Sequence, residues 1–241
     1  MIRINKYIAS SGTYSRRSAE ELIKQKKVTL NGKVVTELST QVDEFNDTVS
    51  INGKPINPIN KKIYVMLHKP KGFITTVSDD KGRATVMDFF PDFLKKTIKP
   101  IGRLDRDSEG LLLFTNDGEL AKTLTHPSSR VKKYYQVTIE GEISTDELKV
   151  LNKGVKIEVD GEEVLTHPIR VKVIDIDNQK KTTKLEVIIA EGKNREIRKM
   201  FAEINKTIIL LKRTQIGKLT LGGLPRGKFK DFNPELTLKN N

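Results

Sequence analysis

The chain has 241 residues, with 44 Lys or Arg against 31 Asp or Glu, so its formal net charge is +13 and a polyanionic partner is expected. The absence of cysteine excludes disulfides, thiolate zinc sites and cysteine nucleophiles, and three scattered histidines disfavour a histidine metal site. No apolar run approaches the roughly 18 residues of a membrane span, and MIRINKYIAS lacks a signal-peptide core. We therefore expect a soluble, cytoplasmic protein without a metal or other cofactor.

Residues 1–36 predict a small α/β unit with a cationic face. They carry eight basic and two acidic side chains. Residues 3–10 have the apolar spacing of a short helix, and Ser15 is the expected N-cap of a second helix. Asn31-Gly32 lies between two β-prone runs, as in a hairpin with a type I′ turn.

Residues 37–60 reverse the charge, with four acids against one base. Pro55 and Pro58 stand among Asn and Gly, which favours a linker over a helix or strand. We place a domain boundary near residue 60. This gives an N-terminal domain with its linker over 1–60 and a larger domain over 61–241.

The segment RINKYIASSGTYSRRSAEELIKQKKVTLNGKVV resembles the small RNA-binding module named after ribosomal protein S-four. The serine-arginine-arginine step and the V-x-L-N-G-K-x-V hairpin are its most specific parts. The resemblance implies that a set of basic side chains contacts phosphates, which position an RNA without reading its bases: Arg3, Lys6, Arg16, Arg17 and Lys26. From the residues alone, an ordinary solvated surface remains the alternative.

The second segment alternates strand-like and helix-like stretches. The expected strands are 64–67, 111–114, 135–139, 169–174 and 184–189, and the expected helices are 118–125, 145–153 and 194–203. Several strands follow one another without a helix between them. This favours an α+β fold in which a mixed, mainly antiparallel sheet carries flanking helices.

A charged loop over 103–109 precedes the apolar run 111–114 and would place ionisable groups at the mouth of a core. The Asp105-x-Asp107-x-Glu109 spacing is that of a calcium loop, but the twelfth position, which needs a bidentate Glu, is Asn116. We therefore reject calcium. A purely structural, salt-bridged loop remains an alternative.

Four segments in this order, HKPKGFITT, GRLDRDSEGLLLFTNDGELA, KYYQV and EGKNREIRKMFAEINKTIILLKRTQIG, resemble the motifs of the RsuA-like family of RNA pseudouridine synthases. The similarity covers almost the whole chain. It implies the pseudouridine synthase fold and an isomerase that converts uridine to pseudouridine in rRNA. Such an isomerisation needs a carboxylate but no thiol or redox cofactor, which suits the composition.

The resemblance also implies roles for single residues. Asp105 of the G-R-L-D element is the catalytic group, acting either as a nucleophile or as a base. Tyr135 belongs to the site, with Tyr134 facing the other way, Arg198 pairs with the aspartate, and Leu211 packs against the target base. Substrate contacts are expected from Lys69, Arg103, Arg106, Arg195 and Lys199. Without the resemblance, Tyr135 and Leu211 would be core residues and Arg198 would lie on a solvated helix face.

A second basic stretch, residues 193–230, has eleven bases against two acids. With the N-terminal domain it would hold one structured RNA at two places. The motif variants favour large-subunit (23S) rRNA. The alternatives are the same activity on small-subunit (16S) rRNA and a non-enzymatic RNA-binding ribosome-assembly factor. We expect a monomer, and the sequence implies no protein partner and no membrane.

Overall fold

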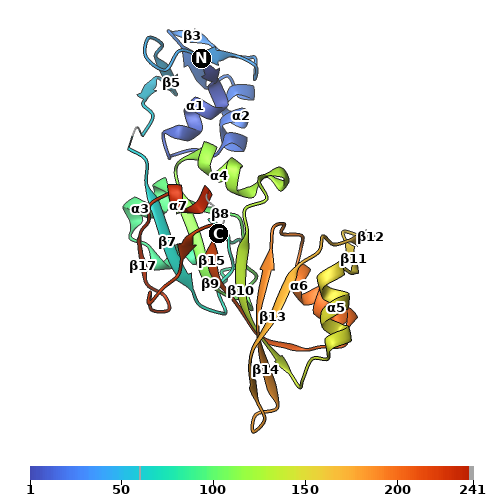
Figure 1. Cartoon of the computed structure of the whole chain (residues 1–241). Coiled ribbons are helices and arrows are strands. Elements are labelled where there is room, and N and C mark those ends of the chain that lie inside the picture. Colours follow the sequence, from blue (N-terminus) through green and yellow to red (C-terminus); the bar gives the residue numbers. More distant parts are fainter. Residues whose placement is uncertain (60, 239–241) are drawn as a thin grey trace. The chain divides into compact units, whose positions relative to one another are not determined.

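The computed structural model describes residues 1–59 and 61–238, and the chain divides into two compact units (Figure 1). Unit 1 comprises Met1–Ile63 and Phe90–Lys99, and unit 2 comprises Tyr64–Phe89 and Pro100–Asn241. The expected boundary at residue 60 lies outside the described residues, as do residues 239–241 of the expected larger domain. Within the described part, no helix is long and apolar enough to cross a membrane.

Unit 1 combines short helices with small antiparallel sheets. Two strands pair as β1-β4, and four form a sheet in the order β3-β2-β5-β6. Its core includes Ile4 and Ile8 of the first helix, Ile23 of the second and Val28 of the hairpin, all 0% exposed. The elements are β1 (Ile2–Arg3), α1 (Ile4–Ser10), α2 (Arg16–Lys24), β2 (Val28–Leu30), β3 (Lys33–Val34), β4 (Gln41–Val42), β5 (Val49–Ile51), β6 (Lys54–Ile56) and α3 (Asp92–Thr97).

Two local predictions in unit 1 are confirmed. The Ser15 hydroxyl accepts from the Ser18 amide, and the Ser18 hydroxyl accepts from the Ser15 amide, so α2 begins with a reciprocal cap. Asn31 and Gly32 both have positive φ, 50° and 81°, as a type I′ turn requires. The Ser15 cap therefore fixes the start of α2, and the Asn31-Gly32 turn fixes the hairpin.

The prediction of a linker around Pro55 is wrong. Lys54–Ile56 forms β6, which pairs antiparallel with β5. Because β6 is the last strand of its sheet, it can hold a proline, whose missing N–H need not enter a ladder. The acidic stretch thus supplies three strands to unit 1, namely β4, β5 and β6.

Unit 2 is built on a nine-stranded sheet whose main path runs β13-β14-β10-β15-β9-β7-β17. β9 and β15 run parallel, and every other pair on this path runs antiparallel. The elements are β7 (Tyr64–Lys69), η1 (Val86–Phe89), β8 (Lys99–Ile101), β9 (Glu109–Thr115), α4 (Gly118–Thr125), η2 (Pro127–Ser129), β10 (Lys133–Glu140), α5 (Thr145–Lys153), β11 (Lys156–Val159), β12 (Glu162–Leu165), β13 (Arg170–Asp177), β14 (Thr182–Ile189), α6 (Glu196–Glu203), β15 (Ile208–Ile216), β16 (Leu219–Thr220), β17 (Phe229–Asp231) and α7 (Glu235–Leu238).

This confirms the α+β class and the mixed, mainly antiparallel sheet. Each expected strand and helix is present, and α4 and α5 have the expected bounds. The sequence analysis did not predict β15 as a strand, nor the β11–β12 hairpin that lies beside α6 (Figure 1).

All seven residues of β9 are buried. On one side of this strand Leu111 and Leu113 pack with Met66, Leu124 and Ile216 in one core cluster. The loop that precedes β9 is therefore attached to a fully buried strand, which matters for the site described next.

Candidate active site

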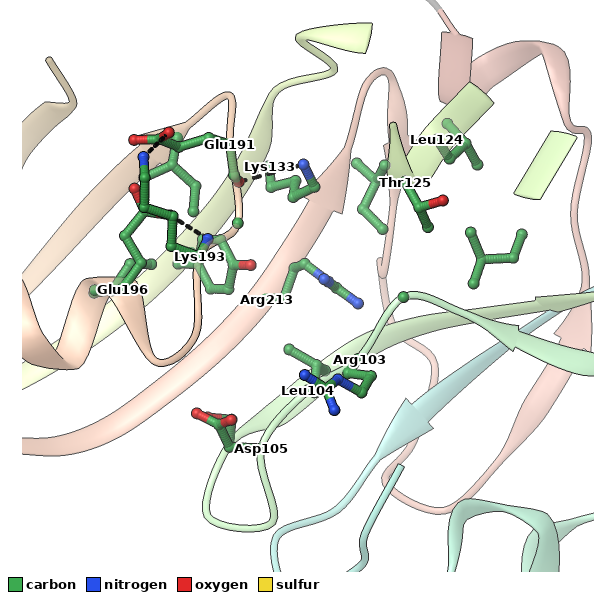
Figure 2. Close-up of a pocket in the computed structure, with 18 of the residues that line it drawn as sticks. Arg103, Leu104, Asp105, Leu124, Thr125, Lys133, Glu191, Lys193, Glu196 and Arg213 are labelled. Atoms are coloured by element: carbon green, nitrogen blue, oxygen red, sulfur yellow. Dashed lines mark hydrogen bonds and ion pairs between the residues drawn. The ribbon is translucent and has the colours of Figure 1, made fainter. Parts of the chain in front are cut away.

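A cavity of about 420 Å³ opens in unit 2 beside the start of β9 (Figure 2). Its size is typical of a small-ligand site. Five segments contribute its polar lining: the loop before β9, the end of α4, one end of β10, the segment that leads into α6, and β15. The ionisable and aromatic lining residues include Arg103, Asp105, Lys133, Tyr135, Glu191, Lys193, Arg195, Glu196 and Arg213.

The β10–β15 pairing brings three lining residues onto one face. Tyr135 stands opposite Arg213, and Val137 stands opposite Leu211. Because side chains alternate along a strand, Leu211, Arg213 and Tyr135 point to the same side, and all three line the cavity. Tyr134 faces away and does not line it, as the sequence analysis expected.

Lys69, which is 0% exposed, binds the backbone of the loop that carries Asp105. The Lys69 ammonium donates to the carbonyls of Pro70 at 3.0 Å, Asp105 at 2.9 Å and Ser108 at 2.8 Å. Burial lowers the pKa of Lys69 to about 8. All three donors are used by backbone, which argues against the expected substrate contact and makes Lys69 a positioning residue.

A second set of bonds joins the same loop to residues 72–75. The Thr75 hydroxyl donates to the Leu104 carbonyl at 2.7 Å. The Gly72 amide donates to the Arg106 carbonyl at 2.7 Å, and the Arg106 Nε donates back to the Gly72 carbonyl at 3.1 Å. Asp105 thus lies between two anchored neighbours. Arg106 is exposed and does not line the cavity.

The ion pair expected between Asp105 and Arg198 is not the one that the structure forms. Asp105 Oδ2 lies 3.4 Å from Arg195 Nη1, whereas Arg198 Nη2 lies 3.2 Å from Asp107 Oδ2. Arg195 also pairs with Asp107 at 3.2 Å. Burial alone would raise the pKa of Asp107, but these two arginines outweigh it and hold that pKa below its usual value. Arg195 is therefore the ion-pair partner of Asp105. Arg198 contacts Asp107, which in turn pairs with Arg195.

Three charged residues ahead of and within α6 form another part of the wall. Lys193 contacts the Glu191 carboxylate, and the Lys193 amide donates to Glu196 Oε2 at 2.9 Å (Figure 2). Burial, with a hydrogen bond to Glu191, raises the pKa of Glu196 to about 8, so its carboxyl group is protonated at neutral pH. Burial opposes ionisation of Glu191 too, but hydrogen bonds from Glu196 and Lys193 lower its pKa to about 2.

The sequence analysis missed Lys133, Arg213 and this glutamate pair as site residues. Arg213 is 4% exposed, and its Nε donates to the Leu111 carbonyl at 2.7 Å. Strand alternation was the signal that could have found it, since Arg213 is two positions from Leu211. Lys199, expected at the substrate, instead donates to the Glu158 carbonyl in β11 and does not line the cavity.

Many charges of the basic stretch 193–230 are compensated within unit 2. Most of its bases are used within unit 2: besides the pairs above, Lys206 pairs with Glu147 at 3.0 Å and Arg226 with Glu109 at 3.0 Å. In unit 1, by contrast, all five residues expected to contact phosphates are exposed: Arg3, Lys6, Arg16, Arg17 and Lys26.

Comparisons with known proteins agree with this geometry. A family model described as RNA pseudouridylate synthase matches residues 63–203, and an S4 domain model matches residues 2–49. The chain is 42% identical to the ribosomal large subunit pseudouridine synthase B of Bacillus subtilis, over 97% of this chain and 93% of that one. It is 35% identical to an uncharacterised RNA pseudouridine synthase of Aquifex aeolicus, over 96% and 90% of the two chains.

Among solved structures, a pseudouridylate synthase crystal structure matches with a TM-score of 0.70 and 27% identity, over 99% of both chains. The family model covers more than half of this chain. An aspartate at a cavity, with its carboxylate next to an arginine and its backbone carbonyl bound by a buried lysine, thus stands in the fold of enzymes that isomerise uridine to pseudouridine. The chain belongs to the RNA pseudouridylate synthase family.

Proposed function

We propose that this enzyme isomerises a specific uridine of large-subunit (23S) rRNA and that Asp105 is its catalytic group. The 42% identity to the Bacillus subtilis large-subunit synthase, over nearly the full length of both chains, supports the substrate. With ribosomal RNA as substrate, the enzyme acts in the cytoplasm.

The observation that carries the site assignment is the placement of Asp105. Its carboxylate lies at the cavity, 33% exposed, while its own carbonyl is bound by the buried Lys69. A carboxylate that is fixed in position yet open to a ligand suits attack on the substrate or proton abstraction from the sugar. Arg195 keeps it oriented by a charge-assisted contact.

The rest of the cavity suits a base that has left its stack. Tyr135 and Leu211 provide an aromatic and an apolar wall on the same sheet face, and a flipped base is held by such contacts. Arg103 is exposed at the cavity and fits a phosphate of the displaced nucleotide. In unit 1, the five exposed basic residues would hold a structured part of the same RNA through its phosphates.

The test maps pseudouridine across both ribosomal RNAs in the parent strain and in a strain that lacks this protein. We expect one large-subunit signal to disappear and to return with the unaltered gene. Asp105→Asn should fail to restore it while the purified variant binds RNA normally, and Asp80→Asn, an exposed acid outside the cavity, should restore it. Loss of a small-subunit signal would reassign the substrate, and restoration by Asp105→Asn would remove Asp105 from the mechanism.

A further inference from the structure

Arg213 is a buried cation at the cavity, and no role has been proposed for it above. Arg213 Nη2 is buried and has no hydrogen-bond partner within residues 1–59 and 61–238, although its Nε is bound to the Leu111 carbonyl. Arg213 lines the cavity, and Figure 2 shows its guanidinium between Lys133 and the loop with Arg103 and Leu104. A buried donor that is left unpaired is unfavourable, and in a binding site it indicates a ligand.

The position of this donor is fixed by backbone packing. Arg213 pairs in parallel with Gly110, directly after the Asp105 loop. Gly110 has a φ of +110°, and a Cβ there would lie 2.2 Å from the Arg213 carbonyl oxygen. The close approach of β9 to β15 therefore ties Arg213 to the loop that carries Asp105. A donor set this rigidly is preorganised for one acceptor.

The surroundings favour an acceptor that carries negative charge. In the described part of unit 2, Arg213 forms no ion pair with an acid. Burial is the largest cause that lowers the pKa values of Lys69 and Lys133, and the charge of Arg213 lowers both further, while nearby carboxylates oppose the shift. A buried guanidinium without an acid partner gains most from an acceptor with developing negative charge.

The shape of the cavity favours the base over the phosphate. Arg213 shares the cavity lining with Tyr135 and Leu211, which are its aromatic and apolar walls on the same sheet face. The more exposed arginines of the cavity, Arg103 and Arg195, are better placed for a phosphate that stays on the RNA backbone. A cavity with an aromatic and an apolar wall and a buried donor suits a pyrimidine with a carbonyl oxygen.

We infer that Arg213 Nη2 donates a hydrogen bond to a carbonyl oxygen of the target uracil and stabilises the uracil anion formed during isomerisation. This inference rests on the proposed function. When the bond between C1′ and N1 breaks, its electron pair stays on the base and spreads onto the carbonyl oxygens. The base then bonds to C1′ through C5, C5 loses its proton, and N1 gains one, so atoms and charge balance. Arg213 acts on the anion that exists after the bond between C1′ and N1 has broken and before C5 bonds to C1′.

The first test compares Arg213→Lys with the unaltered enzyme on an RNA fragment that contains the mapped uridine. Lysine keeps the charge but loses the planar fork, so the single-turnover rate constant should fall about 100-fold, as for loss of one oxyanion donor. The RNA dissociation constant should stay within about 3-fold. Arg170→Lys, the same change at an exposed position of β13, is the control for the substitution itself.

The second test changes the substrate and compares its effect within each enzyme, so a partly misfolded fraction of Arg213→Lys does not alter the ratio that is measured. The target nucleotide is replaced by 2-thiouridine or 4-thiouridine, because sulfur accepts hydrogen bonds weakly. One thio substrate should slow the unaltered enzyme, and the same replacement should have a much smaller effect in Arg213→Lys. A methylphosphonate at the target phosphate should affect both enzymes equally.

Three results overturn the inference: an Arg213→Lys rate equal to that of the parent, equal thio effects in both enzymes, or loss of the Arg213 effect on the methylphosphonate RNA. The last would assign the donor to a phosphate. Failure of the proposed function is recognised separately, because it shows as activity of Asp105→Asn or as no missing large-subunit signal. An inactive Asp105→Asn beside a fully active Arg213→Lys refutes only the role of Arg213.

Discussion

Replacing Lys69 by Met tests whether the buried ammonium positions Asp105. The change leaves three carbonyls without their donor, one buried and two partly buried, at up to about 1–3 kcal/mol for each. It also removes the cost of burying the charge: the drop of the Lys69 pKa from 10.5 to about 8 corresponds to about 3 kcal/mol. The balance is a loss of about 2 kcal/mol in the free energy of unfolding, or about 4–8 °C in melting temperature.

The isomerisation rate of Lys69→Met should fall by more than its loss of folded protein explains. Below the melting temperature, a displaced Asp105 should slow isomerisation about 10- to 100-fold, with RNA affinity unchanged. Single-turnover assays and thermal melting measure the two effects. Lys71→Met, at an exposed neighbour, is the matched control and should cost less than about 0.5 kcal/mol.

The pH dependence gives a sharper test of the same lysine. Because the folded pKa of Lys69 lies below its unfolded value, the stability linked to this group is present above pH 10.5 and is lost as pH falls through about 8. The stability gap between the parent and Lys69→Met should therefore widen from pH 7.5 to pH 9.5 in urea unfolding. A constant or shrinking gap, or a variant as stable and active as Lys71→Met, would refute the reasoning.

Three further outcomes are expected. Gly110→Ala should destabilise the protein by more than about 4 kcal/mol, because its Cβ would overlap the Arg213 carbonyl, and a cooperative melt near the parental temperature would contradict this. The pKa of Glu196 is raised in the folded state, so its contribution to stability falls as pH rises from 4.5 to about 8; Glu196→Gln should remove this slope in urea unfolding at pH 5 and 7.5. Arg17→Glu should weaken RNA binding and reduce the slope of log affinity against log salt by about 1, whereas Lys54→Glu on the edge strand should change that slope far less.

Most of the fold could be predicted because its signals are local. Ser15, the Asn31-Gly32 turn and the apolar run Leu111–Phe114 each specify an element through side chains within a few residues. Pro55 misled the analysis because its tolerance depends on β6 being an edge strand. That property is set by which strands pair, and no nearby residue carries it.

The site was predictable only in part, for a related reason. The resemblance led to Asp105, Tyr135 and Leu211, which the structure brings to one cavity. It did not lead to Arg195 as the partner of Asp105, because the choice between Arg195 and Arg198 depends on how the segment before α6 enters its first turn. Arg195 is in the left-handed conformation at that entry, with a φ of 53°.

The parallel β9–β15 pair has a consequence for how the enzyme is made. Glu109 and Gly110 pair with Lys212 and Arg213, so the cavity walls can close only after β15 has left the ribosome. Pairing at such separation is slow to form because a long loop must close first. Unit 1 draws on no residue beyond Lys99. During synthesis, therefore, residues that contribute to RNA binding emerge long before the enzyme can change an RNA.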